Sequence, residues 1–156
     1  MLRGGQAWIR HYGDSRQHPV NRRMHLLGLP LTAFGLLTLL WALNIPVDTG
    51  TVPLHLNAGL MVVMAAVVYA FLLSPFLAIP FSLGALLAIL AVDWLANQGL
   101  ALAPSGAALM LAGWLLLARG HRAEGNRPDW SGWIQHLPVG LVWLLARGFD
   151  RWRLPW

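Results

Sequence analysis

The sequence contains no cysteine. This absence excludes disulfide bonds, thiolate nucleophiles, and zinc or iron–sulfur sites that depend on cysteine ligands. The chain does contain six histidines and six acidic residues. Any metal ion would therefore have to be held by histidine and carboxylate side chains.

Charged residues are scarce as well. They make up 11% of the chain, compared with about 25% in an average soluble domain, while hydrophobic residues make up 57%. The polar surface is then too small to cover a water-soluble globule, whereas a lipid bilayer would accept the apolar side chains. With 156 residues the chain has the size of one domain, so we predict a single membrane domain over residues 1–156.

Lysine is absent, and the 11 basic residues are all arginines. None of them lies between Met24 and Ala118. They form three groups around that interval: Arg3, Arg10, Arg16, Arg22 and Arg23, then Arg119, Arg122 and Arg127, then Arg147, Arg151 and Arg153. This distribution is typical of charges that flank membrane segments and argues against a nucleic-acid-binding groove, so we expect no nucleic-acid partner.

Long hydrophobic runs occupy the interval without arginine. A helix needs about 20 mainly apolar residues to cross roughly 30 Å of hydrocarbon. Four segments approach this length: residues 26–45, 55–73, 76–95 and 100–118. The second and third are separated only by Ser74 and Pro75, which predicts a tight helical hairpin. Pro104 falls in the first turns of the fourth, where its missing N–H costs little.

A fifth apolar segment, residues 133–146, is shorter and contains Pro138. Arginines flank both of its ends, whereas a crossing would separate them, so we predict an interfacial or re-entrant helix. The expected fold is all-α: an integral membrane bundle of four transmembrane helices plus this short C-terminal helix. The loops around Asp48 and Asn97 carry no basic residue. Both termini are therefore expected on the cytoplasmic side of a bacterial inner membrane.

Five of the six histidines map to the predicted cytoplasmic face: His11, His18, His25, His121 and His136. On a helix, His18, Asn21 and His25 would share one stripe, because they lie at offsets 0, 3 and 7. Glu124 follows His121 by three residues and would share its face. An H-x-x-E pair can supply one nitrogen and one oxygen ligand to a metal ion. The histidines are therefore the main functional signal.

Structural explanations exist for the same residues. His18 precedes a proline and could be an exposed residue at the start of a helix. Arg122 or Arg127 could pair with Glu124 without any catalysis. His136 could be a metal ligand or could contact lipid headgroups. These alternatives stay open at the level of the sequence.

Two motifs together resemble a known family. HPVNRRMHLLGLP at residues 18–30 and GHRAEGNRP at residues 120–128 are similar to motifs of the Mpo1-like (DUF962) family of membrane proteins. The order of apolar segments between and after them is similar too, so the resemblance covers nearly the whole chain. It implies a membrane-bound Fe(II)-dependent dioxygenase that shortens 2-hydroxy fatty acids by one carbon, a step of fatty-acid α-oxidation. Its substrates would be a long-chain 2-hydroxy fatty acid and O2.

The resemblance also implies which residues form the site. The motif residues carry over onto Pro19, Asn21 and His25, and onto Gly120, His121, Glu124, Gly125 and Pro128. The predicted catalytic iron ligands are His25, His121 and Glu124. His18 is a further candidate ligand, and Asn21 is predicted to orient the ligands. The residues predicted to pair with the substrate carboxylate are Arg22, Arg23 and Arg127.

Two positions depart from the family's pattern. Arg16 stands where many members have a histidine, three residues before the proline of the first motif. Leu117 stands where members often have a glutamine. His18 is close enough in sequence to substitute for the missing histidine. The prediction of iron rests on the resemblance, because histidine–carboxylate sites also accept zinc and manganese.

A protein of another class is the main alternative. It would be a non-catalytic membrane protein that binds lipid or a partner, with its histidines packing or capping helix ends. A transporter fits less well, because the predicted spans offer few polar groups at midplane besides Thr38, Ser82 and Asp93. No oligomeric state follows from the sequence.

Overall fold

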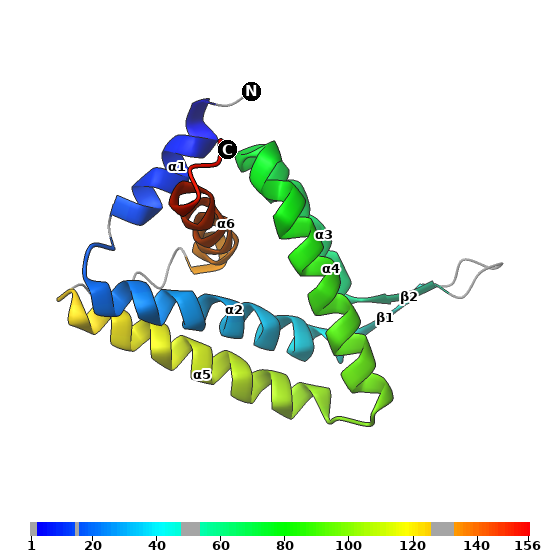
Figure 1. The fold of residues 1–156 in the computed structure, drawn as a ribbon. Helices are drawn as coiled ribbons and strands as arrows, with labels where there is room; N and C mark the ends of the chain where they lie inside the picture. Colours follow the sequence, from blue (N-terminus) through cyan, green and yellow to red (C-terminus); the bar gives the residue numbers. More distant parts are fainter. Residues whose placement is uncertain (1–2, 15, 48–53, 126–132) are drawn as a thin grey trace.

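The computed structural model describes residues 3–14, 16–47, 54–125 and 133–156. These residues form six helices and one pair of short antiparallel strands (Figure 1). In chain order the elements are α1 (Arg3–Asp14), α2 (Pro19–Trp41), β1 (Asn44–Val47), β2 (Leu54–Asn57), α3 (Ala58–Leu73), α4 (Pro75–Asn97), α5 (Leu102–Ala123) and α6 (Trp133–Arg151). The predicted helical fold is confirmed, and the strands are a small addition to it.

Side chains just before three helices cap the helices that follow. Nδ1 of His18 accepts a hydrogen bond from the backbone N–H of Val20 (3.2 Å) at the start of α2. The side chain of Asn57 does the same for the N–H of Leu60 (2.8 Å) in α3. Ser74 is both the C-cap of α3 and the N-cap of α4. This double position of Ser74 produces the tight hairpin predicted between the second and third segments.

The first two predicted segments differ from the helices at the loop that joins them. The segment predicted over residues 26–45 becomes α2, which starts at Pro19 and ends at Trp41. The segment predicted over residues 55–73 loses its first residues to β2, so α3 has 16 residues. Hydropathy did not separate strand from helix here, because an apolar run is compatible with either.

The other predicted segments fall on α4, α5 and α6. α5 begins two residues later than the segment predicted over residues 100–118, ends five residues later, and carries His121 in its last turn. α6 has 19 residues and runs through Pro138, so the predicted short segment 133–146 is part of a longer helix. α1 was not predicted. Its sequence is mostly polar and contains no long apolar run, so hydropathy does not indicate a helix there.

α2 and α5 lie side by side and antiparallel along their whole length (Figure 1). Five glycines, spaced seven residues apart within each helix, line the contact and are called the glycine seam: Gly28, Gly35, Gly106, Gly113 and Gly120. A Cβ atom at Gly28 would come within 3.0 Å of the backbone oxygen of Gly113. One at Gly35 would collide with the backbone of Met110. Small residues of this kind let helix backbones approach closely in membrane proteins.

α3 and α4 form a second antiparallel pair. It meets the first pair near the C-terminal end of α2 and diverges from it toward Ser74 (Figure 1). α1 and α6 bridge the open side, where a cluster of buried apolar side chains joins them to α3 and α4: Ile9, Tyr12, Ala70, Leu73, Leu77, Ala78, Val139, Val142, Trp143 and Ala146. The helices therefore form two pairs bridged by α1 and α6 and not one regular four-helix bundle.

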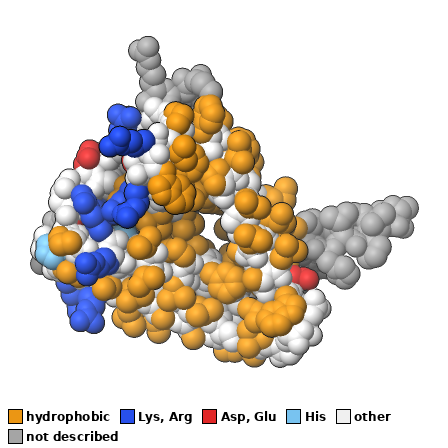
Figure 2. Space-filling view, in the orientation of Figure 1, with side chains coloured by type: hydrophobic (Ala, Val, Ile, Leu, Met, Phe, Trp, Pro, Cys, Tyr) orange, Lys and Arg blue, Asp and Glu red, His pale blue; other side chains and the backbone are white. Residues whose placement is uncertain are grey.

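Apolar side chains cover the outside of both pairs, whereas arginines gather at the side that carries α1, α6 and the adjoining ends of α2 and α5 (Figure 2). Three helices are long and apolar enough to cross a membrane: α2, α4 and α5. α3 is apolar but shorter. Its 16 residues measure about 24 Å, less than the roughly 30 Å of a bilayer's hydrocarbon core. Three of the four predicted spans therefore meet the length requirement in the described residues.

Candidate functional site

The antiparallel register of α2 and α5 brings the two histidine motifs together at one end of the pair. Asn21, near the start of α2, faces Gly120, where a Cβ atom would collide with the Asn21 side-chain oxygen. Next to this contact, the rings of His25 and His121 lie 5.1 Å apart, centre to centre, in an edge-to-face arrangement. The close approach at Gly120 thus places side chains from distant parts of the sequence within contact of each other.

Glu124, the C-cap residue directly after α5, ties this end of α5 to the start of α2. One carboxylate oxygen accepts a hydrogen bond from the backbone N–H of His18 (2.9 Å). The other accepts one from the side-chain amide of Asn21. Burial by itself would raise the pKa of Glu124, but these hydrogen bonds and the charge of Arg16 lower it overall. Glu124 is therefore held as a carboxylate.

His25 is buried, with 1% of its surface exposed, and both of its ring nitrogens are engaged. Nδ1 lies 3.0 Å from the backbone oxygen of Asn21, one turn earlier in α2. Nε2 accepts a hydrogen bond from Nε–H of Arg16 at 3.0 Å. A guanidinium can only donate, so Nε2 is the unprotonated nitrogen, and Nδ1 carries the proton that is donated to Asn21.

Arg16 lies between α1 and α2 and turns inward, so that 7% of its surface is exposed. It donates a hydrogen bond from an Nη to the backbone oxygen of Tyr12, and its guanidinium lies 3.5 Å from the centre of the Tyr12 ring. Burial lowers the pKa of Arg16, while its interactions with Tyr12 and Glu124 raise it. A guanidinium stays protonated in proteins, so the site contains a permanent cation.

α1 and α6 close the other side of the site. Tyr12 packs edge-to-face against His136 of α6, with ring centres 6.0 Å apart, and lies 5.7 Å from Trp143. Gly140 makes room for Tyr12, since a Cβ atom there would come within 2.6 Å of the tyrosine hydroxyl. Burial raises the pKa of Tyr12 above its ordinary value, so the phenol is neutral at physiological pH. His136 therefore lines this side of the site next to a buried, neutral tyrosine.

The three arginines predicted to bind a substrate carboxylate differ in whether their side chains are free to reach a ligand. Arg22 is engaged with the chain itself, because it donates to the backbone oxygen of Arg16 (2.9 Å) and to the side chain of Gln17 (3.2 Å). Arg23 is exposed at the same end of α2. Arg127 lies outside the described residues. Of the three, only Arg23 is exposed in the described part of the chain.

Around the first motif, the structure corrects the prediction for His18 and adds Arg16 and Tyr12 to the site. His18 does not share a helical stripe with Asn21 and His25, because it precedes α2 with extended backbone and caps it. Sequence reasoning missed Arg16 and Tyr12 as members of the site. A signal for Arg16 was present, since it occupies the position where the family often has histidine, but nothing in the spacing showed that its side chain turns inward.

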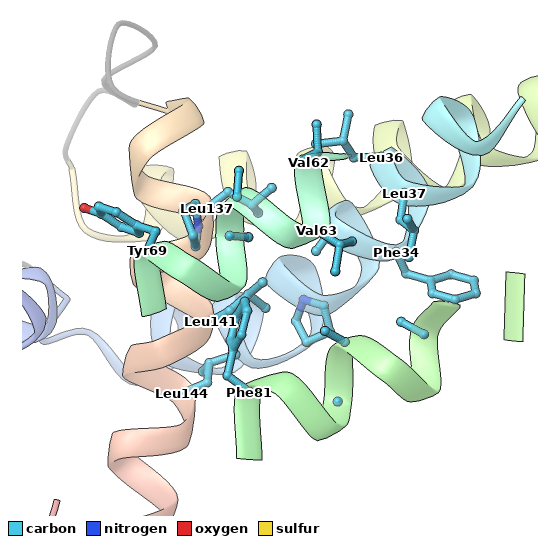
Figure 3. Close-up of a pocket in the computed structure, with 18 of the residues that line it drawn as sticks. Phe34, Leu36, Leu37, Val62, Val63, Tyr69, Phe81, Leu137, Leu141 and Leu144 are labelled. Carbon is cyan, nitrogen blue, oxygen red and sulfur yellow. The ribbon is translucent and has the colours of Figure 1, made fainter. Parts of the chain in front are cut away.

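An apolar cavity of about 780 Å³ lies between α2, α3, α4 and α6 (Figure 3). Its lining includes Phe34, Val63, Phe81 and Leu141. It begins close to the polar site, because Leu137 directly follows His136 on α6. On α2 it begins at Pro30, about 7–8 Å along the helix from His25. Its volume falls within the range of about 300–1,000 Å³ that is usual for ligand pockets.

The described residues contain no group of three or more His, Cys, Asp or Glu side chains placed to hold a metal ion. At His25, the nitrogen that a metal would need is hydrogen-bonded to Arg16. Glu124 binds the start of α2. His25, His121 and Glu124 thus share one end of the helix pair, but in this arrangement they do not fit an iron ion. Iron stays a prediction from the resemblance.

Comparisons with known proteins show a family match. A family model described as "2-hydroxy-palmitic acid dioxygenase Mpo1-like" matches residues 3–147. No curated protein and no solved structure matches the chain. The matched range includes both histidine motifs, Arg16, and the part of α6 that lines the cavity.

Proposed function

The chain belongs to the Mpo1-like family, whose description relates it to 2-hydroxy-palmitic acid dioxygenase, and we propose that it binds long-chain 2-hydroxy fatty acids at the membrane surface. The polar site at the end of α2 and α5 takes the carboxylate and hydroxyl groups, and the apolar cavity takes the hydrocarbon chain. One observation carries the proposal: a buried arginine and two contacting histidines lie at one end of α2, and an apolar cavity of about 780 Å³ begins about 7–8 Å further along this helix.

The charge around the site supports an acidic ligand. Arg22, Arg23, Arg119 and Arg122 all belong to the ends of α2 and α5 that form the site, and Glu124 is the acidic residue among them. This excess of positive charge attracts a carboxylate from the membrane interface. Arginine also binds carboxylates through paired, charge-assisted hydrogen bonds. A neutral lipid would gain less from these groups, because its oxygens cannot form charge-assisted pairs with arginine.

The cavity supports a long hydrocarbon tail. On α6 its lining runs from Leu137 to Leu145, which is about 12 Å of helix. The facing walls on α2, α3 and α4 are apolar as well. Each methylene group removed from water contributes about 0.8 kcal/mol, so a long chain in this cavity would supply much of the binding free energy.

A dioxygenase is the second candidate, and the family match together with the shared location of His25, His121 and Glu124 favours it. In that reading Fe(II) would activate O2, and the fatty acid would be shortened by one carbon. The observed donors do not fit iron while Arg16 binds His25, so we assign no chemical step to it.

We also propose that α3 forms a fourth span and that the site and both termini face the cytoplasm in a bacterial inner membrane. The arginine-free interval from Met24 to Ala118 supports this orientation. Reporter fusions after Asn97 and after Trp156 test it. An external signal after Asn97 and a cytoplasmic signal after Trp156 are expected, and the opposite pattern would contradict the orientation.

Binding measurements on the full chain in lipid nanodiscs test the main proposal. We expect saturable binding of radiolabelled 2-hydroxypalmitate, with hexadecanol competing at least about tenfold less well because it lacks the carboxylate. Equal competition by both compounds would contradict the proposed site. The same preparation, supplied with Fe(II) and O2, tests the second candidate through oxygen uptake and formation of a fatty acid one carbon shorter.

A further inference from the structure

We propose that Arg16 takes the place of a metal ion in this protein, so that the site at the end of α2 and α5 is organised by a guanidinium and needs no metal. The inference rests on the proposed function, because it concerns the same ligand site. It goes further by identifying the cation that holds the histidine and by defining how this chain differs from a metal-dependent relative.

The ring of His25 is oriented like that of a metal-ligating histidine. Its Nδ1–H donates to the backbone oxygen of Asn21 at 3.0 Å. In metal sites, ligating histidines commonly donate their second N–H to a carbonyl or carboxylate in this way, which aims the other nitrogen at the metal. Here Nε2 is aimed at the Nε–H of Arg16, also 3.0 Å away. His25 is thus oriented as a ligand would be, and a guanidinium stands opposite its lone pair.

Several contacts hold the Arg16 side chain in this position. The side chain is buried, donates to the backbone of Tyr12, and lies 3.5 Å from the centre of the Tyr12 ring. Cation–π contact with a desolvated guanidinium is stronger than contact at an exposed position. Tyr12 is itself buried against α6 through Trp143. Moving Arg16 out of the site would break these contacts together with the bond to His25.

The positive charge of Arg16 also opposes metal binding at His25. A permanent positive charge in contact with His25 would repel a divalent cation placed at the same nitrogen, because like charges a few ångströms apart interact strongly away from bulk water. Arginine also supplies no lone pair, so it cannot join a coordination shell. One residue therefore removes a possible ligand at position 16 and occupies the lone pair of a second at position 25.

The decisive experiment compares metal binding by the wild type and by Arg16→His. Both proteins are purified in detergent without oxygen, stripped with chelator, and titrated with Co(II) while the visible absorption of the ion is recorded. We expect no stoichiometric binding by the wild type. Arg16→His should bind about one ion per chain, with visible bands typical of nitrogen and oxygen ligands. Adding His25→Ala to Arg16→His should abolish that binding.

Arg10→His is the matched control, because it introduces the same residue at an exposed position of α1 outside the site. It should bind no more Co(II) than the wild type. Stoichiometric Co(II) or iron in the wild type that is lost in His25→Ala would overturn the inference. So would a folded Arg16→His that binds no more metal than Arg10→His. The wild-type measurement decides the first point even if Arg16→His does not fold.

The proposed function can fail separately. Binding of 2-hydroxypalmitate to the metal-free wild type tests that function, whereas the Co(II) titration tests the place of Arg16. A metal-free protein that binds no fatty acid would contradict the function and leave the inference on Arg16 standing. A wild type that binds both metal and fatty acid would support the function and contradict the inference on Arg16.

Discussion

The two helix pairs of this protein differ in how closely their backbones approach. Along α2 and α5 the glycine seam lets the helix backbones touch, and the pair buries polar side chains such as Asn21, His25 and Thr32. Along α3 and α4 many large side chains point outward, and Gly84 has open space where a Cβ atom would be. The close-packed pair thus builds the polar site, whereas the second pair exposes large apolar side chains and lines the cavity.

The largest expected effect comes from breaking the close pair. Gly35→Ala should destabilise the protein by about 1–3 kcal/mol or more, because the new methyl group collides with the backbone of Met110 and a helix backbone cannot yield as a flexible side chain can. Thermal unfolding in detergent, followed by circular dichroism, measures this change.

Gly84→Ala in α4 is the control for that variant. Both positions are helical glycines, so both gain the same intrinsic helix propensity, roughly 1 kcal/mol. At Gly84 the methyl group meets nothing within 4 Å, so stability should stay equal or rise. Equal losses at the two positions would mean that the seam is not what distinguishes the pairs.

A second expected effect concerns the polar end of each pair. Glu124→Ala should lower the free energy of unfolding by about 1–2 kcal/mol, because the buried amide of Asn21 and the N–H of His18 lose their acceptor. Asp93→Ala, which removes an exposed carboxylate bonded to Asn97 on α4, should change it by less than about 0.5 kcal/mol. Chemical unfolding of both variants provides the comparison, and a larger loss for Asp93→Ala would contradict it.

A third, smaller effect is expected in ligand binding and not in stability. Ala88→Trp fills part of the cavity and should weaken 2-hydroxypalmitate binding by about tenfold. Ala91→Trp, three residues along α4 on its exposed surface, should leave affinity unchanged. Equilibrium binding in nanodiscs distinguishes the two. Unchanged affinity in Ala88→Trp would show that the acid binds outside the cavity, and equal losses in both variants would show that the effect is not specific to the cavity.

The smallest expected effect is a pH dependence. The pKa of Glu124 is lower in the folded protein than its ordinary value, so its contribution to stability is present at neutral pH and is lost as pH falls through that lowered pKa. The stability difference between wild type and Glu124→Gln should therefore shrink on acidification. Melting curves recorded at several pH values would show this, and a constant difference would argue against a charged carboxylate at this position.

Much of the fold was accessible from composition and spacing. The chain has 57% hydrophobic residues and no basic residue from Met24 to Ala118, which indicates membrane segments. In hydrocarbon the backbone N–H and C=O groups have no water to bind, so such segments fold as helices that pair these groups internally. The break at Ser74 was also predictable from local sequence. Serine is a favoured residue just before a helix, and proline is favoured at the first helical position, so Ser74 and Pro75 mark the start of a new helix. The family resemblance, confirmed by the match over residues 3–147, rested on two short motifs.

Other features depended on contacts between distant segments. The glycines were visible in the sequence, but their meaning required the antiparallel register that sets Gly35 against Met110 and Gly120 against Asn21. α1 was missed because its burial depends on α6, which lies more than a hundred residues away in the chain. The side chain of Arg16 turns inward because Tyr12, His25 and Glu124 surround it, and they come from three different helices or helix ends. Residue type and spacing determine which groups are available for chemistry, whereas the packing of helices determines whether the lone pair of His25 meets a metal ion or a guanidinium.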